Sequence, residues 1–337
     1  MERIGGETMV LYGDLLERLA AFEAVRSIAS LPGEFTAKVI KDHIYHYFQT
    51  MLPGGRRQIY LGPDSEEIRR LIKARQAGGE EVRADERMLQ RLAAQIMAGG
   101  VLPVQADMAR IIARLADSGV FRVGGVLVGT VAFKILGTHL GVPREGFSQR
   151  QDVDLASDDR IAIAVPDLKA DVPAAIESLR MGFFPVPRLS LKEPSTSYAI
   201  RGKTLRVDLL TPARRGATAP VFIHRLNAAA APLKYLDYLI EEPISAVMLA
   251  GSPCLVKIPQ PARFAMHKLI VSQERDPTVA AKKKKDVQQA NSLLAVLRED
   301  RPGDIRLAWD ALAKRGSIWT KKVKAACKEA EIPMPVA

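Results

Sequence analysis

The stretch that decides the fold is FRVGGVLVGTVAFKILGTHLGVPREGFSQRQDVDLA, residues 121–156. It begins with an apolar run typical of a buried strand, and that run ends at the turn Gly129-Thr130. A helix-like apolar pattern and a polar loop follow, and a short strand then carries Asp152 and Asp154. Because residues two apart in a strand point to the same side, these two carboxylates are expected to share one face.

A third acidic residue lies further along the chain. Asp208 interrupts the apolar segment LRVDLL, where an unpaired charge would be costly. Carboxylates are the hard ligands that Mg²⁺ prefers, and two divalent ions about 3.5–4 Å apart can neutralise a triphosphate and an attacking oxygen. The backbone N–H groups of Gly129 and Thr130 are expected to be directed where a phosphate would bind. Together with Asp152 and Asp154, this pattern predicts a nucleotide site with two Mg²⁺ or Mn²⁺ ions.

The composition is that of a soluble globular protein with a basic surface. The 337 residues allow two or three domains, and the net charge of +11 is compatible with a nucleotide, RNA or DNA partner. Cys254 and Cys327 lack CxxC spacing, which argues against a disulfide scaffold or a zinc knuckle. The chain shows no signal-peptide pattern and no apolar run long enough for a membrane span. We therefore expect a cytoplasmic protein with no membrane partner.

The region before the central stretch is predicted to combine helices with a small antiparallel sheet. Apolar residues at helical spacing indicate helices over 8–30, 64–98 and 105–118. After the first helix the period changes to two, which predicts a three-stranded meander at about 34–40, 43–51 and 56–61. The polar faces of this meander carry Lys38, Lys41, His43, Arg56 and Arg57, interleaved with Tyr45, Tyr47 and Tyr60.

Two interpretations of the meander remain open. Basic and aromatic groups on a small sheet can hold a phosphate backbone and stack on bases, so Lys38, Arg56 and Arg57 are candidate nucleic-acid contacts. The same pattern arises when the aromatic side chains pack on flanking helices and the basic ones are solvated. A salt-dependent gel shift that disappears in the double variant Arg56→Ala/Arg57→Ala would favour the first interpretation.

The remainder of the chain is predicted to complete a mixed core and then to become helical. A helix is expected at about 171–180, and GFFPVPRLS indicates an irregular or edge segment because its prolines remove ladder donors. The segment SYAIRGKTLRVDLL predicts a hairpin with Gly202 in its turn. Short strands are expected at about 220–224, 246–249 and 254–258, around a helical piece near Leu233–Leu239. Further helices are expected from Pro261, from Lys282, over 303–314 and over 317–329.

These elements predict three regions. Residues 1–115 form an N-terminal helical region with the meander, residues 116–258 form the catalytic core, and residues 259–337 form a C-terminal helical lobe.

The motifs Gly129-Thr130, Asp152-x-Asp154 and Asp208 resemble the signature of the DNA polymerase β-like nucleotidyltransferase superfamily. That signature is a Gly-Ser or Gly-Gly turn, an acid-x-acid strand and then a third acid. From about residue 36 to residue 297, the chain also resembles a bacterial subfamily with this fold. The segments that carry this wider resemblance are YLGPDSEEIR (60–69), LVGTVAF (127–133), QDVDLA (151–156), RVDLLTP (206–212), PARFAMHKLIVSQER (261–275) and KKDVQQA (284–290).

The resemblance implies an α+β fold, with a polymerase β-like core of mixed sheet and helices flanked by helical segments and the meander. It implies metal-dependent transfer of a nucleoside monophosphate from a nucleoside triphosphate such as ATP, with release of pyrophosphate. Asp152 and Asp154 would bind the metal ions, and Asp208 would join one ion and orient or deprotonate the acceptor hydroxyl. The acceptor stays open between an RNA or tRNA end, a protein side chain and a small molecule.

Two features depart from the superfamily pattern. Thr130 replaces the usual serine, which is a mild chemical change. The gap between Thr130 and Asp152 is longer than usual, which predicts an inserted loop at about 141–150 that covers or reshapes the site.

A second group of candidate residues lies in the C-terminal region. Arg263 and Lys268 are candidate nucleotide-binding cations, and the resemblance places Lys268 near the triphosphate. His267 is interpreted as a structural polar contact, and Asp286 as a helix cap or the partner of a basic residue. The run Lys282–Lys285 is interpreted as a solvated face, with a nucleic-acid contact as the alternative.

A hypothesis from another class is a non-catalytic protein that uses the same fold for binding or regulation, as a protein partner in a toxin–antitoxin or phage-defence pair. Radiolabel transfer from each of the four ribonucleoside triphosphates, with Asp152→Ala/Asp154→Ala as control, would separate the two. The sequence leaves the oligomeric state open.

Overall fold

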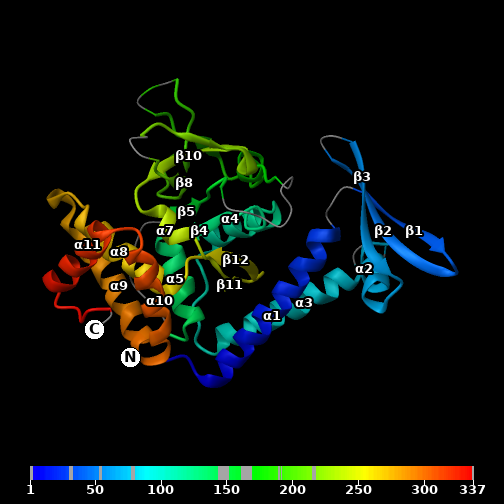
Figure 1. The fold of residues 1–337 in the computed structure, drawn as a ribbon, viewed down its shortest axis with the longest axis horizontal. Helices are drawn as coiled ribbons and strands as arrows, with labels where there is room; N and C mark the ends of the chain where they lie inside the picture. Colours follow the sequence, from blue (N-terminus) through cyan, green and yellow to red (C-terminus); the bar gives the residue numbers. More distant parts are fainter. Residues whose placement is uncertain are drawn as a thin grey trace.

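The computed structural model shows a mixed α/β protein with three parts: an N-terminal arm, a central body and a C-terminal helical lobe (Figure 1). It describes residues 3–29, 33–52, 55–76, 80–142, 152–160, 169–188, 190, 192–214 and 218–335. The inserted loop predicted at 141–150 therefore lies, from residue 143 onward, outside the described residues. Within the described ranges, no helix is both long enough and apolar enough to cross a membrane.

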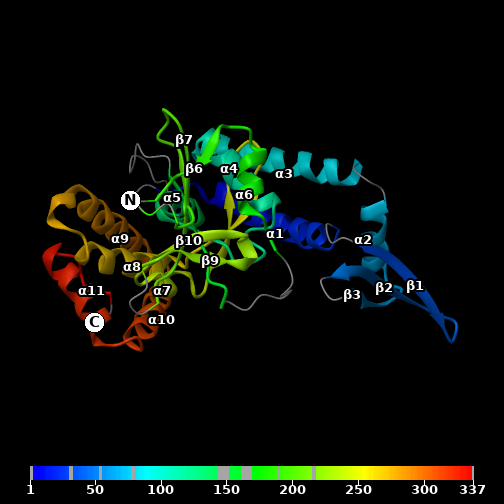
Figure 2. The ribbon, with the colours of Figure 1, turned by 90° about the horizontal axis from the view of Figure 1, so that it is seen from above.

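The arm projects away from the body in both ribbon views (Figures 1 and 2). Its shaft is α1 (Gly6–Ala29) packed along α3 (Glu80–Ala98), and α2 (Glu66–Gln76) lies at the far end. That end also carries an antiparallel sheet of β1 (Gly33–Ile40), β2 (His43–Leu52) and β3 (Gly55–Pro63). The predicted meander is confirmed with small shifts of its ends. The helix expected over 64–98 is instead two helices, α2 and α3; the sequence between them contains two glycines, which disfavour a continuous helix.

A hydrophobic cluster joins the base of the arm to a two-stranded sheet of the body. That sheet consists of β11 (Ile244–Met248) and β12 (Cys254–Ile258), paired antiparallel. The buried residues of the cluster are Tyr12, Leu15, Leu19, Leu89, Ala93, Ile96, Val101, Val247 and Leu249. The leucines at helical spacing on α1 thus have the buried role that their pattern indicates.

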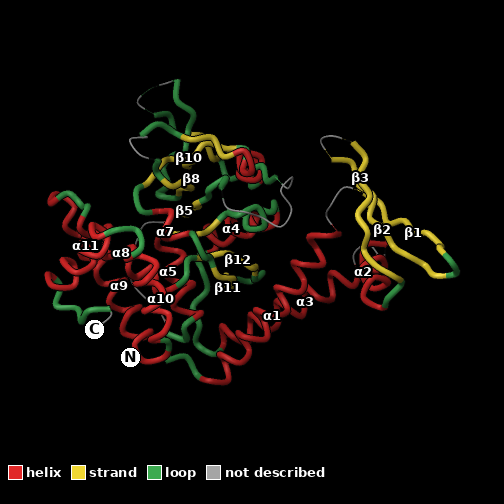
Figure 3. Tube along the Cα trace, viewed as in Figure 1, coloured by secondary structure: helices red, strands yellow, loops and turns green. Residues whose placement is uncertain are grey.

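The body contains a seven-stranded mixed sheet (Figure 3). Its main order is β4 (Val126–Val128), β5 (Asp152–Ala156), β8 (Arg206–Pro212), β10 (Ala228–Leu233) and β9 (Val221–Ile223); β7 (Ser197–Ile200) pairs with β8, and β6 (Phe183–Pro185) with β7. The pairings β5–β8 and β8–β10 are parallel and the others antiparallel. The predicted hairpin and edge segment are confirmed as β7–β8 and β6. The sequence prediction missed β10, because its alanines and proline have weak strand preference.

Period-two alternation divides β5 and β8 into two faces. Four apolar side chains of one face are buried in the main core: Val153, Leu155, Val207 and Leu209. Helix α4 (Ala106–Asp117), which the predicted boundary at 115 assigns to the N-terminal region, packs on β5 and contributes to the same core. Asp152, Asp154 and Asp208 lie on the opposite face and are partly exposed. The alternation that forms the strands therefore also directs these carboxylates away from the core.

The C-terminal lobe is a group of helices around α8 (Pro261–Gln273), which packs against α9 (Ala280–Asp300), α10 (Pro302–Ala313) and α11 (Ser317–Glu329). Helix α8 begins where predicted, because Pro261 fits a first helical turn and Gln260 accepts a hydrogen bond from the Arg263 backbone N–H. Helix α9 begins at Ala280, before Lys282, so Asp286 lies in its second turn and not at its start. The short helices are α6 (Val172–Ser178), α7 (Leu236–Ile240) and the 3₁₀ turns His224–Leu226 and Pro277–Val279.

His139 lies where the arm meets the body and is expected to make the free energy of unfolding depend on pH. Its Nδ1 lies 3.3 Å from the Tyr12 hydroxyl, and burial lowers the pKa of His139 to about 4, with a smaller contribution from Arg301. Because the unfolded chain binds a proton there near pH 6.5, stability is lost as the pH falls below that value. We expect His139→Gln to reduce the loss of unfolding free energy between pH 7.5 and pH 5 by on the order of 1–2 kcal/mol. Urea denaturation at both pH values measures this; equal losses in the two proteins would contradict it.

Candidate active site

The site is built around the turn between β4 and α5 (Gly129–His139). Gly129 has φ +70°, and a side chain there would collide with the Asp154 carboxylate. Val128, the last residue of β4, lies opposite Asp154 in the antiparallel ladder. The glycine therefore lets this carboxylate lie directly against the N-terminus of α5, where the helix dipole is positive.

The three predicted aspartates are brought together on one patch of the sheet. Asp154 lies opposite Asp208 in the β5–β8 ladder, and Asp152 precedes Asp154 on the same face, opposite Arg206. The Asp208 carboxylate is already engaged, because Ser197 Oγ donates a short hydrogen bond to its Oδ1 and Arg206 Nε lies 3.0 Å from the same oxygen. Arg206 Nε also lies 2.6 Å from Ser197 Oγ, so these two side chains fix the orientation of Asp208.

The electrostatics of the patch show an excess of negative charge at Asp154. Burial raises the pKa of Asp154 to about 7, and the neighbouring carboxylates of Asp208 and Asp152 add to the rise. Lys268 and Lys285 oppose it with their positive charges. A carboxyl group with this pKa accepts a cation readily, because the cation relieves the repulsion among the three aspartates.

The donor chemistry of the patch fits Mg²⁺ or Mn²⁺, since all three groups are carboxylates. In the part of the chain that the structure describes, however, no three His, Cys, Asp or Glu side chains converge closely enough to hold a metal ion as they stand. To hold an ion together with Asp152 and Asp154, the Asp208 side chain would have to rotate so that one carboxylate oxygen leaves Ser197 and Arg206.

A group of cations from the helical lobe faces these carboxylates. Lys285 Nζ of α9 donates to Thr130 Oγ1 at 2.9 Å, and burial lowers the pKa of Lys285, with a smaller contribution from Lys268. The next residue, Asp286, is only 3% exposed and accepts from Lys268 Nζ at 2.8 Å and Arg275 Nε at 3.0 Å. The interpretation of Asp286 as the partner of a basic residue is therefore confirmed.

The sequence interpretation of the lysine run was wrong at one position. Lys282 and Lys284 are exposed, and Lys283 pairs with Glu329, but Lys285 reaches the Gly-Thr turn. Its position in the helical repeat could have singled out Lys285. It directly precedes the first buried residue of α9 and so borders the buried side of the helix. Arg275 was also missed, since it follows α8 and joins the site only through the fold.

A pocket of about 440 Å³ adjoins the carboxylates. One face of α8 lines it with Phe264, His267, Lys268 and Val271, at the spacing of three and four residues that one helix face requires. The lining also includes Gly129 and Asp154 on the carboxylate side, and Leu239 and Tyr235 beside the charged Lys234 and Glu274. Tyr235 has φ +65°, and its ring packs edge-on against Trp319 at 4.6 Å. The pocket thus has the size and mixed lining typical of small-molecule sites.

His267 lies on the pocket face of α8. Burial lowers the pKa of His267 to about 3, and the neighbouring Lys268 charge adds to this, so the ring is neutral at physiological pH. Its Nδ1 is buried and has no hydrogen-bond partner among the described residues. The polar contact expected for His267 is therefore not formed at that nitrogen.

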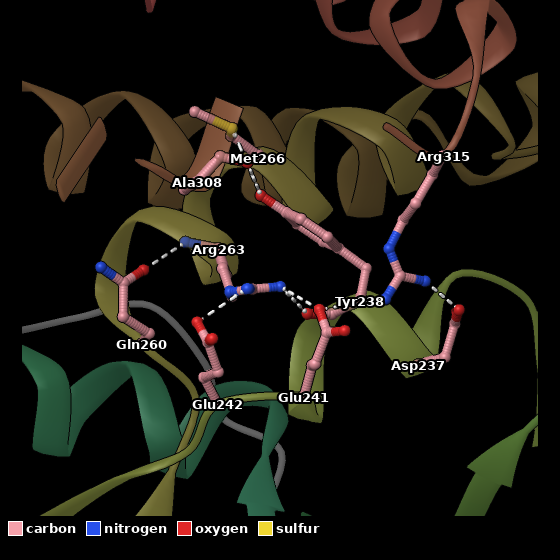
Figure 4. A network of polar contacts seen from close by, with 9 residues as sticks. All are labelled: Asp237, Tyr238, Glu241, Glu242, Gln260, Arg263, Met266, Ala308 and Arg315. Carbon is pink, nitrogen blue, oxygen red and sulfur yellow. Dashed lines mark hydrogen bonds and ion pairs between the residues drawn. The ribbon is translucent and has the colours of Figure 1, made fainter. Parts of the chain in front are cut away.

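Arg263 does not reach the pocket, and Figure 4 shows where its side chain goes. Arg263 is only 5% exposed, and its guanidinium donates to Glu241 at 2.6 Å, to Glu242 at 2.7 Å and to the Tyr238 backbone oxygen at 3.3 Å. Arg315 extends the network by contacting Glu241 at 3.1 Å. These contacts tie α8 to α7, so the geometry favours a structural role for Arg263.

Replacing Arg263 with leucine is expected to lower the free energy of unfolding by about 1–3 kcal/mol, because three hydrogen bonds of a buried side chain are lost. Nucleotide affinity is expected to stay unchanged, since Arg263 is not among the residues that line the pocket. Chemical denaturation and nucleotide titration of the same preparation measure both quantities. A variant that keeps its stability and loses nucleotide affinity would show that Arg263 belongs to the site.

The remaining candidates lie on the arm. Lys38 is an exposed residue of β1, and Arg56 and Arg57 belong to β3, where their side chains lie outside the description. None of the three lines the pocket beside Asp154.

The fold and the site together define a mixed α/β protein with a carboxylate patch, an opposing cation group and an adjoining pocket. A nucleotidyltransferase family model matches residues 106–314, which include every element of this site. The match covers more than half of the chain, so the chain belongs to this nucleotidyltransferase family. Comparisons with curated proteins and with solved structures gave no match.

Proposed function

We propose that the protein is a metal-dependent nucleotidyltransferase with a polymerase β-like core. It transfers a nucleoside monophosphate from a nucleoside triphosphate to an acceptor and releases pyrophosphate. Family membership supports the class of reaction. The observation that carries the proposal is the position of Asp154, whose raised pKa, neighbouring carboxylates and contact with the α5 N-terminus coincide on the carboxylate side of the pocket.

Asp152, Asp154 and a turned Asp208 are the residues that would hold two Mg²⁺ or Mn²⁺ ions. Bound ions would neutralise charge on the triphosphate and on the attacking oxygen. Asp208 is also placed to orient the acceptor hydroxyl or to take its proton, because Ser197 and Arg206 control the direction of its carboxylate.

The cations of the helical lobe serve the triphosphate in this proposal. Lys268 and Arg275 line the pocket beside Asp154, and Lys285 contacts the turn at which α5 begins. Backbone N–H groups at a helix N-terminus bind phosphate oxygens, so the turn and Lys285 together form a phosphate subsite. Asp286 holds Lys268 and Arg275 toward it.

The apolar and aromatic residues of the pocket lining receive the nucleoside in this proposal. Tyr235 and Phe264 offer aromatic surface, and leucines of β8 and α7 complete the wall. Burying the base there positions the α-phosphate near the carboxylates and excludes water from it. The acceptor is an RNA or tRNA end, a protein side chain or a small molecule, and the reaction takes place in the cytoplasm.

One observation favours a second candidate, a non-catalytic member of the family that binds or regulates, as in toxin–antitoxin or phage-defence pairs. Asp208 is occupied by Ser197 and Arg206, and the described carboxylates do not converge on an ion position. In this candidate the pocket binds a nucleotide without turnover.

The experiment that tests the proposal measures transfer directly. The protein is incubated with each α-labelled ribonucleoside triphosphate, with Mg²⁺ or Mn²⁺, and with RNA, protein or small-molecule acceptors. We expect labelled acceptor and released pyrophosphate from the wild type and neither from Asp152→Asn/Asp154→Asn. Nucleotide binding without transfer would establish the second candidate. A wild type that neither labels an acceptor nor binds metal–nucleotide would overturn both.

Replacing Asp286 with asparagine tests the cation group. Lys268 and Arg275 would lose the buried counter-ion that holds them, and we expect the free energy of unfolding to fall by about 3–5 kcal/mol. At temperatures where the variant is folded, the KM for the nucleotide should rise more than kcat falls. The matched control is Lys283→Ala, whose pair with the exposed Glu329 should contribute roughly 0–1 kcal/mol. Equal stabilities of the two variants would contradict this role for Asp286.

A further inference from the structure

The sheet at the end of the arm carries an aromatic surface that the proposed reaction does not use. Within β1–β3, Tyr47 lies opposite Tyr60 and Lys38 lies opposite Tyr45. The Tyr60 ring centre is 5.4 Å from that of Tyr47 and 6.2 Å from that of Tyr45. Alternation along the strands puts these four side chains on one side of the sheet, which we call the tyrosine face.

The tyrosine face is prearranged by its own contacts. Lys38 Nζ lies 4.8 Å from the centre of the Tyr47 ring and donates to Gln58 Oε1 at 2.8 Å. Gln58 in turn donates to Thr36 Oγ1 at 3.3 Å. An ammonium group has three N–H donors, so Lys38, which gives one to Gln58, retains donors for a ligand.

The other side of the sheet is buried around Phe48 and exposed toward the β1–β2 turn, where Val39 and Ile44 lie. Phe48 is 1% exposed and its ring packs against Phe35 at 5.2 Å. Tyr60 on the tyrosine face is 54% exposed, and the strands of this sheet make their main contacts with one another. Figures 1 and 2 show the sheet standing away from the body at the end of the shaft. Tyr60 is thus open to a ligand, Tyr45 and Tyr47 beside it are half-buried, and none of the three rings belongs to the buried core.

The chemistry of this face matches an unpaired nucleic-acid strand. Clustered rings on a rigid sheet provide a stacking platform for bases, and stacking tolerates any base sequence. The three strands and two turns of residues 33–63 carry four basic residues, Lys38, Lys41, Arg56 and Arg57, against the acidic Glu34 and Asp42. Their positive excess complements a phosphate backbone. Bases within a duplex are already stacked, so the platform favours single strands over double strands.

We propose that the tyrosine face binds a single-stranded nucleic acid. The strand stacks bases on Tyr47 and Tyr60 while Lys38 contacts its phosphates. This surface lies on the arm and shares no residue with the pocket beside Asp154, so binding here does not depend on the proposed transfer. If the acceptor of that transfer is a nucleic acid, the arm binds a part of the strand that lies away from the end that reacts in the pocket.

The test uses the full chain and fluorescein-labelled RNA and DNA oligonucleotides of about 16 nucleotides, within the site sizes of such platforms. Fluorescence anisotropy is measured without nucleoside triphosphate and without divalent ions. We expect binding of the single strand that weakens as salt increases, and weaker binding of a duplex of the same sequence. Comparison of the RNA and DNA strands shows which of them the face prefers.

Variants separate stacking from folding. Tyr47→Leu/Tyr60→Leu keeps apolar bulk on the strands and is expected to weaken binding about tenfold or more, because the stacking surface is lost. Tyr47→Phe/Tyr60→Phe keeps the rings and should bind like the wild type. Lys38→Ala should reduce the salt dependence, whereas Lys324→Ala, an exposed lysine of α11, should change nothing.

Two results would overturn the proposal: unchanged binding by the leucine double variant, or binding of the duplex as tight as that of the single strand. The variant Asp152→Asn/Asp154→Asn is expected to keep full oligonucleotide binding while lacking transfer. Loss of oligonucleotide binding by the arm and loss of transfer at the active site are therefore distinguishable in the same set of variants.

Discussion

Replacing Asp154 with asparagine should abolish nucleotidyl transfer and, at pH 8, make the metal-free protein more stable. Asparagine keeps the shape of the side chain but cannot supply the charge that holds a cation. Loss of several kcal/mol of transition-state stabilisation corresponds to a rate lower by roughly 10³-fold or more. Pyrophosphate release from the nucleoside triphosphate measures this effect.

The gain in stability follows from the pKa of Asp154, which is raised to about 7 by burial and by the carboxylates of Asp208 and Asp152. Between pH 4 and pH 7 the folded protein binds more protons at this site than the unfolded chain. Stability therefore falls as the pH rises through that range. The asparagine variant escapes this loss, and we expect it to be more stable than the wild type by about 2–4 kcal/mol at pH 8, with little difference at pH 4.

Urea denaturation in the presence of a chelator measures these stabilities at the two pH values. The matched control is Asp310→Asn, at an exposed position of α10, which should leave stability unchanged at both. Added Mg²⁺ should stabilise the wild type and not the Asp154 variant, because only the wild type has the complete carboxylate patch. A variant that retains transfer, or that is less stable at pH 8, would contradict this account of Asp154.

Replacing Gly129 with alanine is expected to have the second largest effect. The backbone there has φ +70°, which an L side chain adopts at a cost, and the new methyl group would displace the Asp154 carboxylate. We expect the free energy of unfolding to fall by about 1–3 kcal/mol and transfer to be lost along with nucleotide affinity. Thermal denaturation, nucleotide titration and pyrophosphate release measure the three consequences.

The control for this substitution is Gly303→Ala in α10, where an added Cβ meets open space. Removing a glycine there should be neutral or stabilise the protein by about 0.4–1 kcal/mol. If Gly129→Ala behaves like Gly303→Ala, the turn has no role in placing the carboxylate.

Local patterns predicted the features that depend on near neighbours in the chain. Asp152 and Asp154 share a face because strand residues two apart always do, and the meander was evident because alternation and turn residues are short-range signals. Pro261 likewise marked the beginning of α8. The buried face beneath the aspartates consists of Val153, Leu155, Val207 and Leu209, their immediate neighbours in the chain.

Long-range placement decided what these patterns could not. Arg263 and Lys268 lie on the same helix, yet one turns to the acidic residues that follow α7 and the other to Asp286. The lysine run has uniform chemistry, but only Lys285 meets Thr130, a residue 155 positions away. No periodicity encodes such pairs, because they depend on how α9 packs against α5 and α8.

The sequence by itself determined the turn at Gly129, the shared face of the aspartates and their order along the chain, since each depends on backbone conformation over a few residues. Only the tertiary structure decided that Asp208 lies beside Asp154 and that Asp286 binds Lys268 and Arg275 near them. It also decided that a pocket lies between the sheet and α8. The physical reason is that pairing of strands and packing of helices join distant residues. The charge balance of a site, including the raised pKa of Asp154, exists only after they meet.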